Sequence, residues 1–127
     1  MEAVLKKLHH KGQTPVLVLE LPSELKALKD AFSVPVHSAA KGAYGFVLGF
    51  AKSQKEAKVV AKALKKALAD EKALLWLAYP KGSSKKYPDV DLNRDSLHAL
   101  MAELGLDGVS LVALDADWSA MRFKLTG

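Results

Sequence analysis

Three short apolar runs constrain the fold of this chain more than any other feature of its sequence. They occupy residues 15–21 (PVLVLEL), residues 44–51 (YGFVLGFA) and the LLWLAY stretch within residues 72–79. Apolar runs of this length without polar alternation are typical of β-strands buried on both faces, as in parallel sheets. Such strands need a layer of helices on each side of their sheet. The runs therefore indicate a protein built in layers around a central sheet.

Amphipathic segments lie between these runs and predict the helices. Residues 23–32 (SELKALKDAF) carry large apolar side chains at helical spacing, and we expect Ser23 to cap the start of this helix. Residues 53–70 begin with an S-x-x-E capping box made by Ser53 and Glu56. Four lysines, at positions 55, 58, 62 and 65, fall on one face of this longest helix, and we interpret them as its solvated face.

The C-terminal third predicts one more helix and a closing hairpin. Asn93 caps an apolar-periodic segment that Gly105 closes. Residues 109–113 and 119–125 are predicted strands, and the Asp-Ala-Asp-Trp segment between them forms a turn. The whole pattern predicts an α/β fold, a three-layer Rossmann-like sandwich with a mostly parallel sheet and a C-terminal antiparallel hairpin. We find no linker or repeat, so we expect residues 1–127 to form a single domain.

Composition narrows the classes of function. The 127 residues include no cysteine, which excludes disulfides, thiolate nucleophiles and cysteine-ligated metals. The formal net charge is +5, but only Arg94 and Arg122 among the 19 basic residues are arginine, so nucleic-acid binding ranks last among the functions considered. There is no signal-peptide pattern and no apolar run of roughly 20 residues, so we expect a cytoplasmic protein without membrane contact.

The order of the elements is similar to that of class I S-adenosylmethionine-dependent methyltransferases. The stretches YGFVLGF and ALLWLAYPKG resemble the fourth and fifth strands of those enzymes, whose sheet also ends in a hairpin. The family follows its first strand with a glycine-rich turn, whereas this chain continues with residues 20–25 (ELPSEL). The acidic residue expected after a second strand is also missing, because that piece ends in residues 37–39 (HSA). The resemblance therefore implies the fold without its cofactor loop.

A closer resemblance covers nearly the whole chain. The segments LPSEL, YGFVLGFAKS, LLWLAYPKGSS, DLNRD and DADWSAMRF resemble a family of small bacterial α/β proteins of unknown function. Members of that family are similar to a methyltransferase-type sheet that lacks the cofactor loop. This resemblance implies a fold and supplies no catalytic residues, because fold does not determine function.

The polar loop after the third apolar run is the first candidate for a binding site. Ligands of open α/β sheets bind beyond the carboxyl ends of strands, and this loop follows such an end. Its lysines, hydroxyls and glycine suit a phosphate or carboxylate, although the spacing differs from that of a P-loop. A solvated lysine-rich turn is the alternative interpretation. The candidate residues are Lys81, Gly82, Ser83, Ser84, Lys85 and Lys86.

Other polar clusters have simpler structural explanations. Asp91, Asn93 and Asp95 suit a helix start better than a calcium loop, because the glycine and distal glutamate of such a loop are absent. Asp115 and Asp117 suit a turn, although two carboxylates can divide acid and base roles when burial separates their pKa values. The four histidines lack metal-ligand spacing, and no catalytic residues, metal or cofactor are assigned.

Two hypotheses of function follow from these residues. The leading one is a non-catalytic binding or interaction protein on a degenerate methyltransferase-like scaffold. The alternative is a protein or enzyme that binds a small anionic ligand, a nucleotide or phosphate, at the loop of residues 81–86. A homodimer is compatible with both, because small α/β domains present faces that can associate symmetrically.

Overall fold

The computed structural model of this chain describes residues 1–126 and centres on one six-stranded sheet. Its strands are β1 (Val16–Leu19), β2 (Val36–His37), β3 (Phe46–Phe50), β4 (Leu74–Pro80), β5 (Leu106–Ala113) and β6 (Trp118–Leu125). They lie in the order β2-β1-β3-β4-β6-β5. The first four are mutually parallel, whereas β6 runs antiparallel to both β4 and β5. This arrangement confirms the predicted α/β class and its closing hairpin.

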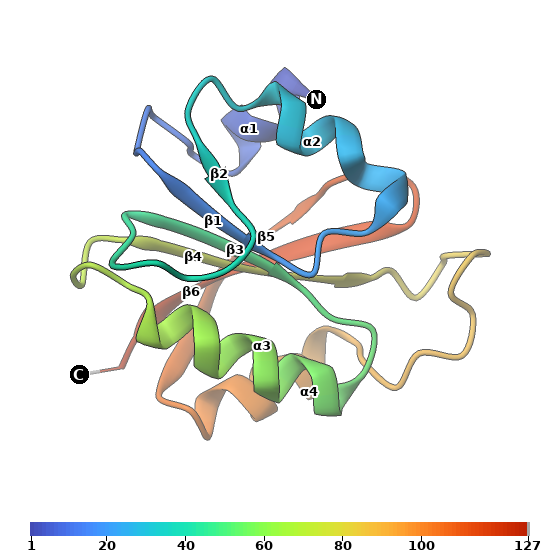
Figure 1. The fold of residues 1–127 in the computed structure, drawn as a ribbon. Coiled ribbons are helices and arrows are strands. Elements are labelled where there is room, and N and C mark those ends of the chain that lie inside the picture. Colours follow the sequence, from blue (N-terminus) through green and yellow to red (C-terminus); the bar gives the residue numbers. More distant parts are fainter. Residues whose placement is uncertain (127) are drawn as a thin grey trace.

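Helices cover both faces of the sheet (Figure 1). One layer holds α1, η1 and α2, and the other holds α3 and α4. Their bounds are α1 (Glu2–Lys7), η1 (Ser23–Leu25), α2 (Lys26–Ala31), α3 (Gln54–Lys66) and α4 (Arg94–Ala102). Among the described residues, no helix combines the length and the apolar character that a membrane crossing requires.

The alternation of side chains along β3 and β4 divides the core into two clusters. Val47 and Leu75 point toward α3 and α4, whereas Leu48 and Trp76 point toward α1 and α2. All four are at most 1% exposed, as expected for strands covered on both faces. The indole Nε1 of Trp76 donates to the carbonyl oxygen of Leu8 at 2.9 Å, which gives the buried ring a polar partner.

Helix starts show where local prediction succeeds and where it fails. Ser53 caps α3, because its Oγ accepts a hydrogen bond from the backbone N–H of Glu56 at 3.1 Å. Asn93 caps α4 in a reciprocal capping box with Ser96. The prediction that Ser23 caps the second helix is wrong, because Pro22 precedes η1 and no side chain caps it. Pro22 already sets the extended backbone from which the 3₁₀ turn starts.

Candidate functional site

The strand order reverses between β1 and β3, which creates a crevice at one edge of the sheet. From β1 the chain first crosses to β2 on one side, and it later returns to β3 on the other side. Both crossovers leave the carboxyl ends of β1 and β3 without a covering connection between them. Ligands of open α/β sheets bind at such a switch point.

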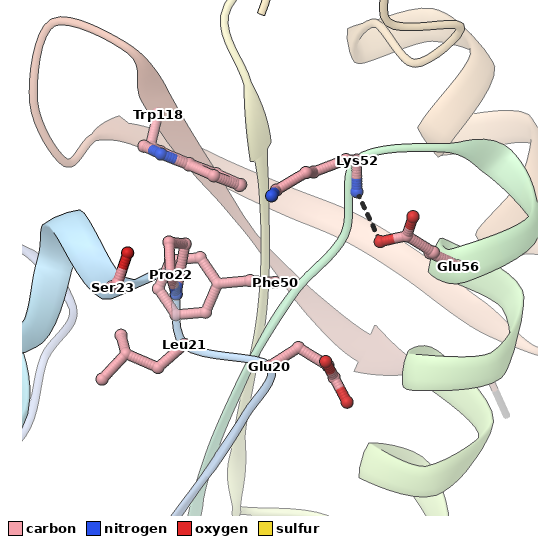
Figure 2. A pocket seen from close by; sticks show the side chains of 8 residues that line it. All are labelled: Glu20, Leu21, Pro22, Ser23, Phe50, Lys52, Glu56 and Trp118. Atoms are coloured by element: carbon pink, nitrogen blue, oxygen red, sulfur yellow. Dashed lines mark hydrogen bonds between the residues drawn. The ribbon is translucent and has the colours of Figure 1, made fainter. Parts of the chain in front are cut away.

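A cavity of about 290 Å³ lies at this place, and we call it the switch-point crevice. Figure 2 shows its lining side chains, with Phe50 and Trp118 forming an aromatic wall and Lys52 reaching toward Trp118. The two rings meet edge to face with their centroids 5.3 Å apart. The lining residues are Glu20, Leu21, Pro22, Ser23, Phe50, Lys52, Glu56 and Trp118.

Glu20 ends β1 in an unusual backbone conformation. Its φ is 59°, in the left-handed region that residues other than glycine adopt at a cost of order 1–2 kcal/mol. Strained backbone of this kind often occurs at binding sites, which makes Glu20 a candidate site residue. The Glu20 side chain is exposed, and among residues 1–126 no hydrogen bond or ion pair to it is formed. Glu20 also borders two neighbouring hollows, one beside α3 and one beside β2.

The first turn of α3 brings a second carboxylate to the crevice. Glu56 Oε1 accepts a hydrogen bond from the backbone N–H of Lys52 at 3.2 Å, drawn as the dashed line in Figure 2. This contact holds the segment between β3 and α3 in place. The Nζ of Lys52 lies 5.1 Å from the centroid of the Tyr87 ring, within cation–π range. The crevice therefore contains two carboxylates and one ammonium group.

Glu24, just after the crevice turn, ties three groups together. Its carboxylate accepts hydrogen bonds from the Tyr87 hydroxyl and, at 3.3 Å, from the Trp118 indole Nε1. It also pairs with Lys86 Nζ at 3.4 Å. The Tyr87 hydrogen bond is the main cause that lowers the pKa of Glu24 from 4.5 to about 2. Burial, with the same hydrogen bond, raises the pKa of Tyr87 to about 12.

The loop predicted from sequence to bind an anion is partly engaged with the protein itself. Ser84 is 5% exposed, and its Oγ donates to Asp117 Oδ1 at 2.8 Å while accepting from the Tyr87 N–H at 3.1 Å. Lys86 is paired with Glu24, as described above. Gly82, Ser83 and Lys85 are exposed, and Lys81 is half-buried with its N–H bonded to the carbonyl oxygen of Asp117 at 2.8 Å. A ligand role for residues 81–86 stays a prediction.

The other polar clusters take structural positions. Asp115 Oδ1 accepts hydrogen bonds from the N–H groups of Asp117 and Trp118, both at 2.8 Å, so it closes the predicted hairpin turn. Asp91 Oδ1 accepts from the N–H of Gln54 at 2.9 Å, which joins the loop before α4 to the start of α3. Of the residues in the predicted hairpin turn, 115–118, Trp118 alone lines the crevice.

Most of the residues that line the crevice carry no sequence signal of a site. Glu20 and Lys52 each look like ordinary polar residues at a strand end, and Phe50 looks like a core residue. Their convergence depends on β1 and β3 lying side by side, with Leu19 opposite Gly49. The carboxyl ends of strands at a switch point commonly form binding sites. Applied to the first two apolar runs together, this rule predicts a site where the crevice lies.

The chain is similar to known proteins in its fold but not in its sequence. No protein-family model and no curated protein matches the chain. The N-methyltransferase NodS from Bradyrhizobium japonicum WM9 has a similar structure, with a TM-score of 0.63 at 11% identity over 98% of this chain and 93% of that one. A SAM dependent methyltransferase from Aquifex aeolicus gives 0.63 at 12% identity, covering 98% and 89%.

LepI, solved in complex with SAM, is also similar, with a TM-score of 0.58 and 14% identity. The match covers 98% of this chain but 39% of LepI, so the chain spans less than half of that protein's length. Together these likenesses define the class of the fold, a Rossmann-like sheet of the methyltransferase type. At such identities they show the fold alone, and the resemblance to a family of small bacterial proteins stays a prediction.

Proposed function

We propose that this chain is a non-catalytic binding protein on a methyltransferase-like scaffold, and that a small, positively charged molecule occupies the switch-point crevice. The observation that carries the proposal is the placement of Glu20 and Glu56 at the point where the strand order reverses. This is the place in open α/β sheets that receives ligands.

The charge of the crevice favours a cation. Two carboxylates, those of Glu20 and Glu56, and one ammonium group, that of Lys52, line the crevice. Phe50 and Trp118 also line the crevice, but they are 2% and 0% exposed, so the carboxylates carry the argument. A ligand with an amine or quaternary ammonium group matches this excess of negative charge.

The turn after β1 argues against methyl transfer. A glycine-rich turn lets the backbone approach a bound nucleotide-like cofactor closely. Here Glu20, Leu21 and Pro22 place side chains along the crevice instead (Figure 2). The volume of about 290 Å³ is also just below the range of about 300–1,000 Å³ typical of ligand pockets. Both features favour a ligand smaller than S-adenosylmethionine.

A thermal-shift panel tests this proposal. Methylamine, choline and putrescine are compared with sodium chloride at equal ionic strength, and S-adenosylmethionine and its demethylated product are included. A compound present at 100 times its dissociation constant stabilises by about 2.7 kcal/mol, which raises the midpoint by several degrees. We expect at least one cation to do so. Stabilisation by the methyl donor alone, or by none of the cations, contradicts the proposal.

Paired variants locate the site. In Glu20→Gln/Glu56→Gln the charges are removed while the amide oxygen of residue 56 can still accept from the Lys52 N–H. The matched control, Glu71→Gln/Asp89→Asn, removes two exposed carboxylates elsewhere. We expect the first variant to lose the cation response and the control to keep it.

The alternative, an anion bound by residues 81–86, rests on the residues of that loop whose side chains remain available. Lys85 is exposed, whereas Lys86 is paired with Glu24. A triple variant, Lys81→Ala/Lys85→Ala/Lys86→Ala, separates the two proposals, because it leaves both crevice carboxylates in place. Loss of an anion response in this variant would support the loop, and an unchanged response would exclude it.

A further inference from the structure

A second cavity lies at the opposite edge of the sheet, near the amino ends of the parallel strands. Its volume is about 320 Å³, and it opens between the loop after α1, the start of β4 and the middle of β6. We call it the basic cavity. It shares no lining residue with the switch-point crevice. Its lining residues are His9, Lys11, Gln13, Lys72, Leu74 and Arg122.

We propose that the basic cavity binds a phosphate group. Three of its lining residues, Lys11, Lys72 and Arg122, are basic, and none of the described residues that line it is acidic. Asp70 lies close in the chain, and its Oδ1 accepts a hydrogen bond from the Lys72 N–H at 2.9 Å, within the turn that leads to β4. The local positive charge therefore favours the binding of a compact anion.

Arg122 is the residue that most needs a partner. It lies on β6 opposite Trp76 of β4 and Ser110 of β5, and it is partly buried. Its Nε is buried, and so is Ser110 Oγ; neither atom has a hydrogen-bond partner among the described residues. A buried polar atom without a partner destabilises the fold, and more so when it belongs to a charged group. Such an atom in a native fold requires an explanation.

A bound anion supplies that explanation for the charge of Arg122. Within residues 1–126 the only other arginine, Arg94, has a carboxylate partner, Asp95 at 3.7 Å, whereas no ion pair involves Arg122. The guanidinium group presents a planar fork of donors that matches phosphate oxygens, and the two lysines add point charges. A phosphate oxyanion would therefore neutralise a cation that the protein itself leaves uncompensated.

The loop that carries Lys11 is held in a fixed shape. His9 adopts a φ of 58°, Gly12 a φ of 85°, and the His9 ring stacks on Trp76 at a centroid distance of 6.4 Å. The Lys11 N–H donates to Gln13 Oε1 at 2.7 Å. This local network sets the direction of the cavity wall before a ligand arrives, which reduces the ordering cost of binding.

An NMR titration tests the site with inorganic phosphate as the probe. Sodium phosphate replaces sodium chloride at constant ionic strength and pH, and amide shifts of the ¹⁵N-labelled full chain are followed. We expect saturable shifts confined to residues 9–13, 72–74 and 122. Saturable shifts centred elsewhere, or no saturation, would overturn the proposal.

Three variants sharpen the test. Lys11→Ala/Lys72→Ala changes two exposed side chains, and Arg122→Met removes the guanidinium group while keeping an apolar chain. We expect each to raise the dissociation constant about tenfold or more, a factor worth 1.4 kcal/mol. The control Lys55→Ala/Lys58→Ala removes the same charge from the exposed face of α3 and should leave affinity unchanged. If Arg122→Met does not fold, the lysine pair alone decides the outcome.

A second arm distinguishes a free ion from a phosphate carried by an organic molecule. Glycerol phosphate is titrated under the same conditions. Tighter binding of the ester indicates a phosphorylated metabolite, and equal or weaker binding indicates the free ion. If a short RNA binds with affinity that falls steeply with salt while neither phosphate compound does, the proposal is wrong and the cavity belongs to a nucleic-acid surface.

Discussion

The phenolic hydroxyl of Tyr87 donates a hydrogen bond to the carboxylate of Glu24, a residue 63 positions earlier in the chain. This contact ties the loop after β4 to the turn after β1, beside the switch-point crevice. Lys86 and Trp118 contact the same carboxylate, so the loop after β4 and the start of β6 both meet this one acidic side chain. Of these contacts, the one from Trp118 involves a residue that lines the crevice.

The first prediction concerns acid stability. The pKa of Glu24 falls from 4.5 to about 2 on folding, so its ionised form stabilises the fold fully above pH 4.5. That contribution is lost as pH falls toward 2. We expect Glu24→Gln to show a shallower loss of unfolding free energy between pH 5 and pH 2 than the native chain, measured by urea denaturation. Parallel curves for the two proteins would show that Glu24 has no such role.

The second prediction concerns Ser84. In Ser84→Ala the Tyr87 N–H and Asp117 Oδ1 both lose their partner, which should cost about 1–3 kcal/mol of stability. The neighbouring variant Ser83→Ala changes an exposed side chain and should stay within about 0.5 kcal/mol of the native chain. Urea denaturation measures both. Equal stability of the two variants would mean that Ser84 does not anchor the loop.

The third prediction concerns Gly49, where β3 passes beneath α3. A Cβ at this position would lie 2.4 Å from Val60 Cγ1 and 2.9 Å from Leu64 Cδ1, so Gly49→Ala should push the helix away at a cost of about 1–3 kcal/mol. Gly45→Ala is the control, because its nearest contact is 3.5 Å from Gln13 Cγ. Thermal unfolding should separate the two variants, and a tolerant Gly49→Ala would show that α3 adjusts freely.

The fourth prediction concerns the backbone of Glu20. Glycine adopts a φ of 59° without the steric cost that other residues meet, so Glu20→Gly should stabilise the chain by up to about 1 kcal/mol. Glu20→Ala removes the same carboxylate but keeps a Cβ, and should give no such gain. If both variants change stability equally, the side chain rather than the backbone is responsible.

The sequence predicts those strands and helix starts that have a local chemical signal. The apolar runs identify β1, β3 and β4 because strands covered on both faces tolerate few polar residues. Ser53 and Asn93 mark helix starts because their side chains bond the first free N–H groups.

The sequence predicts neither cavity, because the residues that line each one come together only in the folded chain. The crevice combines the ends of β1 and β3 with the first residue of β6. The spacing of Glu20, Phe50 and Trp118 in the sequence does not indicate a common site. The loop of residues 81–86 stood out by composition, yet composition does not reveal that Glu24 binds Lys86 or that Asp117 binds Ser84. Such long-range partners follow from topology, which short motifs do not encode.

The measurement that tests the central claim most directly is methyl-donor binding and turnover by the purified chain. S-adenosylmethionine with a labelled methyl group is incubated with the protein and a panel of small amines, and its demethylated product is titrated by calorimetry. The proposed non-catalytic role predicts no labelled product and no saturable heat. Label transfer to an amine, or tight binding of the demethylated product that Glu20→Gln/Glu56→Gln abolishes, would contradict it and identify the crevice as a methyltransferase active site.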